Sequence, residues 1–487
     1  MNFATTPVPD QTFEIVRHFE RSQQLQYLTV PFEVPEGVEI LTIAYDYPMH
    51  FYETLPLSMG EFTVKKQVNT IDLGLIGPKS EQVGTSGSNK DEIFVSETVS
   101  TPGYQTVAIT PGTWQILVGV YRVGVEGVDV TYTITFKMKQ RRLLIGDLHT
   151  HTVGSDGILI LDHLARHARA HGLDFLAVTD HNQPISRESL PQVEGLTLIP
   201  GVEWTQFQGH ANFLGVDQPY DGAFFANDLA GVQEKFMTAH ERGALIVLNH
   251  IQDDTLPFTY NLASLPFDAL EVWNGPMRMS NLRGIGMWDA LLKQGLKVPA
   301  VGGSDYHADR FGQMLAGPCM GVYTESAGIS DILEAVRKGQ SYIVFQPGAA
   351  TLDMRIVMQP EPGVDVECEE LSLEADPDNN VGRDWRDLRQ SAENSSTEQT
   401  ILMGGTAQWQ EGLFLEVSLS GLAKGDVVKL ISPSGSRDVL TCPGRGEFVG
   451  RFPVTEPGYV RLELWQSYMG MLPPMPILVS NPIWVDF

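Results

Sequence analysis

The sequence predicts a mixed α/β protein in which a central α/β barrel is flanked by N-terminal and C-terminal domains that resemble β-sandwiches. The chain has 487 residues, which exceeds the size at which one hydrophobic core keeps growing, so two to four domains are expected. In the middle of the chain, short apolar runs alternate with helical patterns and end in polar residues, as they do in α/β barrels. Both flanks instead contain short runs rich in β-branched and aromatic residues, separated by turn residues.

The composition indicates a soluble protein that does not bind polyanions. Hydrophobic residues make up 42% of the chain, which is ordinary for a globular protein. The 33 basic and 60 acidic residues give a net charge of −27, so we expect neither nucleic acid nor a membrane as a partner. The three cysteines are too few and too scattered for a disulfide framework or a thiolate zinc site. Because no signal peptide and no membrane-spanning apolar run is evident, we expect a cytoplasmic location.

Residues 1–140 predict a β-sandwich domain. The turn signal Pro35-Glu36-Gly37 separates the first two strand-like runs. The runs lie at 26–32, 39–45, 105–109, 114–121 and 128–136. Because short strands at regular spacing are typical of sandwiches, we interpret this domain as a packing or oligomerisation module, which leaves a homo-oligomer open.

Between residues 141 and 349, the predicted strands are bounded by residues of the types that commonly bind metal ions, histidine, aspartate and glutamate. Leu143 to Ile145 reads as a buried strand that leads to His149 and His151, which point to the same face of an extended backbone. Later apolar runs border further histidines and carboxylates: Asp180 and His181, Glu203, His210, Asn249 and His250, and Asp305 and His307. Because the C-terminal ends of barrel strands meet at one face, these residues predict a multinuclear metal site.

A predicted helix at 161–171 carries histidines that could be mistaken for ligands. Its apolar stripe repeats at i, i+3, i+4 and i+7. Three histidines lie four residues apart on the other side, where an i, i+4 pair could bind zinc: His163, His167 and His171. Because a helix buries its apolar stripe, we expect these imidazoles, and that of His240 in a later helix, to face solvent.

Residues 350–487 predict an acidic loop followed by a small C-terminal β domain. The stretch 361–399 is polar and acid-rich without the spaced aspartates of a calcium loop, so we expect a loop or linker. Strand-like runs return at 413–418, 427–431, 447–452, 459–464 and 483–485.

The central motifs resemble those of the PHP (polymerase and histidinol phosphatase) metallohydrolase superfamily. The resemblance covers residues 143–345 and follows the family's order: His149-x-His151 with Ser155-Asp156-Gly157, Thr179-Asp180-His181, Pro200-Gly201-x-Glu203, Asn249-His250 and Ser304-Asp305-x-His307. It implies a distorted (β/α)7 barrel that holds two or three divalent metal ions. The core with its flanking domains is also similar to the branch that includes the carbaryl-hydrolysing esterases.

The resemblance further implies nine metal ligands, namely His149, His151, Asp156, His181, Glu203, His210, His250, Asp305 and His307. Imidazoles and carboxylates without a thiolate suit Zn, Mn or Fe. Among these residues, Glu203, His250 and Asp305 are the candidates for catalytic roles as metal-bridging or metal-activating ligands, and Glu203 is the natural bridge between two ions.

Other polar residues near the motifs have two interpretations each. Asp147 and Asp180 could orient the imidazoles of the ligands, or they could cap the ends of strands. The side chains of Arg278, Arg283 and Arg310 could bind an anionic group of a substrate, or they could form surface ion pairs.

The function that the resemblance implies is a metal-dependent hydrolase with a metal-bridging hydroxide, in the first place a phosphoesterase acting on a small-molecule phosphate ester. Two metal ions about 3.5–4 Å apart can activate a shared hydroxide and stabilise both the attacking and the leaving oxygen. The same hydroxide could attack a carboxyl or carbamoyl ester, so a carboxylesterase or carbamate hydrolase is the alternative. A third interpretation, a non-catalytic metal-binding scaffold, would be marked by missing ligands, and none of the nine is missing.

Overall fold

A computed structural model of the chain describes residues 8–57, 59–310, 313–358, 400–467 and 473–487. The chain divides into two compact units, residues 5–141 and residues 142–487. Among the described residues, no helix combines the length and the apolar character needed to span a membrane.

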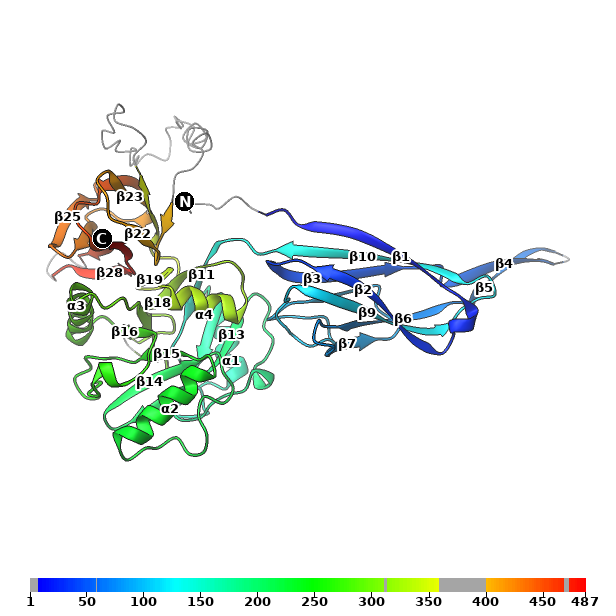
Figure 1. Cartoon of the computed structure of the whole chain (residues 1–487), viewed down its shortest axis with the longest axis horizontal. Coiled ribbons are helices and arrows are strands. Elements are labelled where there is room, and N and C mark those ends of the chain that lie inside the picture. Colours follow the sequence, from blue (N-terminus) through cyan, green and yellow to red (C-terminus); the bar gives the residue numbers. More distant parts are fainter. Residues whose placement is uncertain (1–7, 58, 311–312, 359–399, 468–472) are drawn as a thin grey trace, which may run out of the picture. The chain divides into compact units, whose positions relative to one another are not determined.

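The unit formed by residues 5–141 consists of two four-stranded antiparallel sheets and a separate hairpin (Figure 1). One sheet has the strand order β1-β10-β3-β8 and the other β2-β9-β6-β7. The strands are β1 (Gln11–Phe19), β2 (Gln26–Val34), β3 (Val38–Asp46), β6 (Thr70–Ile76), β7 (Gln82–Ser86), β8 (Glu92–Val95), β9 (Gly112–Arg122) and β10 (Val128–Met138), and the hairpin is β4 (His50–Leu57) and β5 (Gly60–Gln67). A short 3-10 helix, η1 (Arg21–Gln23), joins β1 to β2.

One core lies between the two sheets, as the predicted alternation requires. Ile43 and Ile134 from one sheet and Val30 and Ile116 from the other belong to the same buried cluster. The prediction of a strand at 105–109 is wrong, because that segment forms single backbone hydrogen bonds from Gln105 and Val107 to two different neighbours instead of a ladder.

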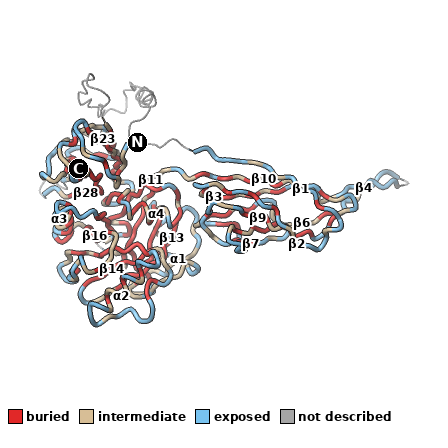
Figure 2. Tube along the Cα trace, viewed as in Figure 1, coloured by how far each residue is buried: buried red, intermediate tan, exposed pale blue. Residues whose placement is uncertain are grey.

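The other unit, residues 142–487, is built on a large mixed sheet. Its central strands have the order β17-β16-β15-β14-β13-β12-β11-β18-β19. They are β11 (Arg142–Asp147), β12 (Phe175–Val178), β13 (Thr197–Gln206), β14 (Gly209–Leu214), β15 (Leu245–Leu248), β16 (Ala269–Asn274), β17 (Ala300–Gly303), β18 (Cys319–Thr324) and β19 (Ser341–Val344). Buried residues follow these strands (Figure 2), and a parallel bridge from Thr150 to Tyr306 links the segment after β11 to the segment after β17.

The predicted α/β class is confirmed, but a (β/α)7 barrel is not shown. In the described residues, the α-helices are α1 (Leu161–Ala170), α2 (Leu229–Glu241), α3 (Met279–Lys293) and α4 (Ile329–Arg337), and the short 3-10 helices η2 (Arg187–Ser189) and η3 (Leu262–Ser264) follow β12 and β15. A two-residue turn joins β13 to β14 as an antiparallel hairpin, which leaves no room for a helix between them. The unit therefore contains more β-sheet and fewer helices than the predicted (β/α)7 barrel would.

The histidines of α1 and α2 lie largely as predicted. The stripe of Leu164, Ala165 and Ala168 is buried, while His163, His171 and His240 are exposed. The exception is His167, which is half-buried with Nε2 3.8 Å from Oδ1 of Asp309. The loop that follows β17 covers this imidazole, and periodicity within the helix does not report such a contact.

The strands after residue 350 continue the same unit, because β28 pairs with β19. The large sheet extends through β28-β27-β24-β25, a second sheet has the order β21-β20-β23-β26, and β22 pairs with β29. These strands are β20 (Thr351–Met358), β21 (Ile401–Leu402), β22 (Thr406–Gln408), β23 (Leu413–Leu422), β24 (Val427–Ser432), β25 (Gly435–Thr441), β26 (Gly446–Pro453), β27 (Gly458–Gln466), β28 (Met475–Ser480) and β29 (Ile483–Asp486). The stretch 361–399 lies outside the described residues, and a domain boundary at 349–350 stays a prediction.

A buried ion cluster joins α3 to β27. The side chain of Arg461 on β27 is 2% exposed and donates from Nη2 to Oδ1 of Asp289 on α3, at 2.9 Å. Its Nη1 donates to Oε1 of Glu463 at 2.6 Å, and the guanidinium lies 4.8 Å from the ring centroid of Trp288. One cation thus serves two carboxylates from different parts of the unit.

We expect Arg461→Met to lower the free energy of unfolding by about 3–5 kcal/mol, because Asp289 and Glu463 lose the buried cation that they share. Urea denaturation measures this loss. The matched control is Lys297→Met, which breaks an exposed pair with Asp486 and should cost less than about 1 kcal/mol. Equal losses in the two variants would show that the cluster contributes no more than a surface pair.

Candidate metal centre

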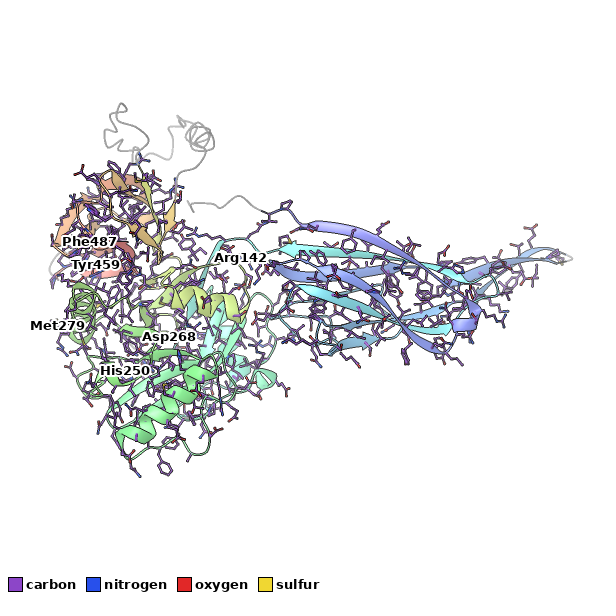
Figure 3. All side chains as sticks on the ribbon, in the orientation of Figure 1. Arg142, His250, Asp268, Met279, Tyr459 and Phe487 are labelled. Carbon is purple, nitrogen blue, oxygen red and sulfur yellow. The ribbon has the colours of Figure 1, made fainter. Side chains whose placement is uncertain are left out.

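The nine predicted ligands lie on neighbouring strands of one sheet or on the segments that directly follow them. His149, His151 and Asp156 follow β11, His181 follows β12, Glu203 lies in β13, His210 in β14, His250 after β15 (Figure 3), and Asp305 and His307 after β17. Two parallel bridges, Thr150 to Tyr306 and His181 to Glu203, hold these segments in register. The sheet order therefore brings ligands from distant parts of the sequence to one edge.

Glu203 is the centre of this cluster. Its carboxylate is fully buried and lies within 3.5 Å of five imidazoles. Its Oε2 is 3.4 Å from His149, 3.5 Å from His151 and 2.8 Å from His181, whereas its Oε1 is 3.0 Å from His210 and 3.4 Å from His250. Because the two oxygens face different imidazoles, one carboxylate can serve two ions.

Four buried atoms of the cluster face one another without a hydrogen-bond partner among the described residues. They are Nε2 of His149, Nε2 of His151, Oε2 of Glu203 and Oδ1 of Asp305. Oδ1 of Asp305 is 3.4 Å from Nε2 of His149 and 3.0 Å from Nε2 of His151. Four ligands bound tetrahedrally at about 2.0–2.1 Å lie about 3.3 Å apart. Since unpartnered buried polar atoms are costly, this donor set fits a divalent metal ion.

Further ligand groups adjoin this one. Oδ1 of Asp156 is 3.1 Å from Nε2 of His307 and 3.6 Å from Nε2 of His181. Three overlapping groups could each hold an ion: His151, Asp156, His181 and His307; His149, His151 and Glu203; and His181, Glu203 and His210. The structure thus brings all nine predicted ligands together, and their roles as ligands stay a prediction.

Opposing effects set the charges of these groups. Burial alone would raise the pKa of Glu203, but His149 and the other imidazoles hold that pKa well below its ordinary value. The same imidazoles lower the pKa of Asp305 against the effect of burial. For His149, burial lowers the pKa, and the carboxylates of Glu271, Asp305 and Glu203 more than offset it. At His151 the effect of burial dominates, and its pKa is lowered. The imidazoles therefore favour the ionised forms of Glu203 and Asp305.

These shifts predict a stability maximum for the metal-free protein. The pKa values of Glu203 and Asp305 lie below the ordinary 4.5 and 3.8, so their stabilisation is complete above those values and is lost as the pH falls through the lowered pKa values. The pKa values of His149, His181 and His250 lie above 6.5, so their stabilisation is lost as the pH rises through the raised ones. The lowered pKa of His151 acts in the opposite direction, but three raised imidazole pKa values outweigh it, so we expect the thermal-unfolding midpoint of the metal-free protein to peak between pH 4.5 and 6.5.

Calorimetry across pH with chelator, and again with excess metal, checks this expectation. Metal ions displace protons from imidazoles, so the midpoint of metal-loaded protein should not fall as the pH rises above 6.5. Identical profiles with and without metal would contradict it.

One buried carboxylate that no motif pointed to orients the cluster. Glu271 in β16 is 2% exposed, and its Oε1 lies 3.0 Å from Nδ1 of His149. Its Oε2 accepts the backbone N–H of His250 at 2.8 Å and Nδ2 of Asn274 at 3.1 Å. Nδ2 of Asn249 similarly donates to Oε1 of Glu203 at 2.9 Å. The available signal for Glu271 was a charged residue in the middle of an apolar strand.

Asp147 and Asp180 act as caps of backbone and hydroxyl groups. Asp147 accepts the backbone N–H groups of His149, Ser304 and Ala316, and burial raises its pKa to about 6. Asp180 accepts the backbone N–H and the hydroxyl of Thr152 and the hydroxyl of Ser155: 2.7, 2.6 and 2.8 Å. Of the two interpretations from the sequence, the contacts favour the cap over the orientation of imidazoles.

The three candidate arginines differ in their surroundings. Nη2 of Arg278 is 3.2 Å from Oδ1 of Asn274, which connects it to Glu271, and 3.3 Å from Oδ2 of Asp253. Arg283 forms a surface ion pair with Asp254, and Arg310 is exposed three residues after His307. Contacts of the described residues thus connect Arg278 to the network around the ligands, and a role in substrate binding stays a prediction for all three.

Comparison with known proteins leaves the family of this chain open, and no family model matches it. It is 37% identical over 83 residues to the 5'-3' exoribonuclease Rnm of Salmonella typhimurium, a match covering 15% of this chain and 28% of that protein. Two solved structures are each 17% identical in sequence to this chain. One, from Bacteroides vulgatus, is a two-domain protein described as containing a predicted PHP-like metal-dependent phosphoesterase, with a TM-score of 0.37 over 70% of this chain and 96% of its own. The other is a protein from Bifidobacterium adolescentis described as a metal-dependent phosphoesterase. Its TM-score is 0.27, and the match covers 39% of this chain and 96% of that protein.

Proposed function

We propose that this protein is a metal-dependent hydrolase of the PHP superfamily and that it cleaves a phosphate ester of a small molecule. The observation that carries the proposal is the set of four unpartnered, mutually facing atoms around Glu203. Structural polar groups in a protein interior are normally hydrogen-bonded, so such a set is typical of a site that binds an ion. The ordered motifs of the sequence support the same superfamily.

The residues of the centre would have different roles in this reaction. Divalent ions bound there, which we expect to be Zn, Mn or Fe, would supply an activated water molecule and neutralise charge on the ester oxygens. Glu203 would join two ion sites through its two oxygens, with Asp305 completing one site and His250 the other. Glu271 holds the His149 ring through Nδ1 and thereby keeps Nε2 aimed at the site. Arg278, which contacts Asn274 beside Glu271, would bind the anionic end of a substrate.

Elemental analysis of the purified protein, followed by an ester screen with the metal found, tests the proposal. We expect two or three ions per chain and turnover of phosphate monoesters that chelation abolishes and metal restores. A protein that binds no divalent metal, or that is fully loaded and hydrolyses no ester of any kind, would refute it.

A carboxylesterase or carbamate hydrolase is the second candidate, in line with the resemblance to the carbaryl-hydrolysing branch. It is favoured by the pairing of two of the three candidate arginines, Arg283 with Asp254 and Arg278 with Asp253, which leaves less positive charge for a phosphate group. Cleavage of naphthyl acetate or a naphthyl carbamate, without cleavage of any phosphate ester, would decide for it.

A further inference from the structure

Large apolar side chains are exposed on the loops that carry the candidate ligands. Phe207 is 100% exposed, Ile158 60% and Leu256 46%, and Val153 is exposed as well. Scattered single apolar residues are normal on a protein surface, but a group around one site marks a place where something apolar binds.

Hydrogen bonds of the backbone connect two of these residues to the segments that carry the candidate ligands. The backbone N–H of Ile158 donates to the carbonyl of His307 at 2.9 Å, and the carbonyl of Leu256 lies 3.3 Å from Nδ1 of His250. Phe207 occupies the two-residue turn between the strands of Glu203 and His210.

A cross-link joins two of these loops. The backbone N–H of Thr259 donates to the carbonyl of Gln208 at 2.7 Å, which fixes the loop after His250 against the turn of Phe207. These apolar residues therefore lie on segments that are hydrogen-bonded to the segments of the candidate ligands or to one another.

The charges of the same loops do not suit a polyanion. The segments 149–160, 179–190, 204–209, 249–264 and 304–317, which form the rim of the candidate centre, contain seven acidic residues, two arginines (Arg187 and Arg310) and no lysine. The nearby cations Arg278 and Arg283 are paired with Asp253 and Asp254. A polyanionic substrate is held by a surplus of cations, which this rim lacks.

We infer that the substrate carries an uncharged apolar group, aryl or branched alkyl, next to the scissile ester, and that Phe207 with Ile158 and Leu256 covers this group. The inference rests on the proposed function, since it names the substrate class of the same centre. Burying a phenyl ring against such side chains is typically worth a tenfold or larger gain in binding, roughly the discrimination that an apolar pocket achieves.

The test compares phosphate esters whose leaving groups are both primary alkoxides, so that intrinsic reactivity is matched. With metal-loaded protein, we expect kcat/KM for benzyl phosphate to exceed that for glycerol 3-phosphate roughly tenfold or more. Benzyl and methyl acetate serve as the corresponding pair if the centre proves to cleave carboxyl esters.

Variants of Phe207 then test whether the preference for the benzyl ester depends on the exposed apolar side chains. Phe207→Ala should reduce the preference for the benzyl ester about tenfold, mainly through KM, whereas Phe207→Leu should keep most of it. The matched control is Phe51→Ala, which removes an exposed phenylalanine of the other unit and should change neither rate.

The outcomes separate two failures. Preference for glycerol 3-phosphate, or equal losses on both esters in Phe207→Ala, would overturn the inference and leave the hydrolase intact. Absence of turnover on every phosphate and carboxyl ester would overturn the proposed function, and the inference with it.

Discussion

Replacement of Glu203 by glutamine is expected to lower kcat/KM of the metal-loaded protein about 10³-fold or more. The amide keeps the shape of the side chain, but one oxygen becomes an NH₂ group that cannot bind a cation. All five surrounding imidazoles then lose the carboxylate that they share. Loss of a single preorganised charge-stabilising group costs about 10²–10³ in rate, and Glu203 serves more than one ligand group.

Kinetics and elemental analysis of the same sample measure this effect. We expect Glu203→Gln to hold at least one ion fewer per chain than the wild type. The matched control is Glu416→Gln, which removes a carboxylate paired with Arg355 and Arg451 in the C-terminal strands and should leave the metal content unchanged. If Glu203→Gln kept both its full metal content and its activity, Glu203 would not be the bridge of the centre.

The grouping of the nine candidate ligands could be predicted from the family resemblance together with local apolar runs, which place most of them shortly after a strand, although Glu203 lies within β13 and His210 near the start of β14. His149 and His151, for example, are two residues apart, and the alternation of an extended chain places them on one face. The parallel order β11, β12, β13 then brings His181 and Glu203 beside them. Here local pattern and sheet topology agree, so short motifs suffice.

The features that could not be predicted depend on contacts between distant segments. Glu271 meets His149 across 122 residues of sequence, and only the folded sheet places the two together. The departure from a regular (β/α)7 barrel at this point has a similar cause, because the chain turns at Phe207 and Gln208 and returns directly as the antiparallel strand β14. A period of two in the sequence does not distinguish a strand that ends in a helix from one that ends in a hairpin.

Substitution of Glu271 therefore tests a contact of the centre that none of the sequence motifs predicted. Its carboxylate accepts two donors through Oε2, the backbone N–H of His250 and the amide of Asn274, while Oε1 faces Nδ1 of His149. A carboxylate in this position fixes the tautomer of the imidazole, with the proton on Nδ1 and the lone pair of Nε2 free for a metal ion.

Glu271→Gln is expected to weaken metal binding or activity about 10–100-fold, since an amide nitrogen facing Nδ1 would favour the tautomer whose Nε2 carries the proton. Metal affinity by competition with a chelating dye is the decisive measurement, because a merely structural role would change stability and leave affinity intact. The matched control is Asp268→Asn (Figure 3), directly before β16, where Asp268 accepts the backbone N–H of Ile246 and pairs with Arg337. We expect that variant to unfold at lower temperature with unchanged metal affinity. If both variants lost stability alone, the segment after β11 would hold His149 without help from Glu271, and Glu271 would contribute only to packing.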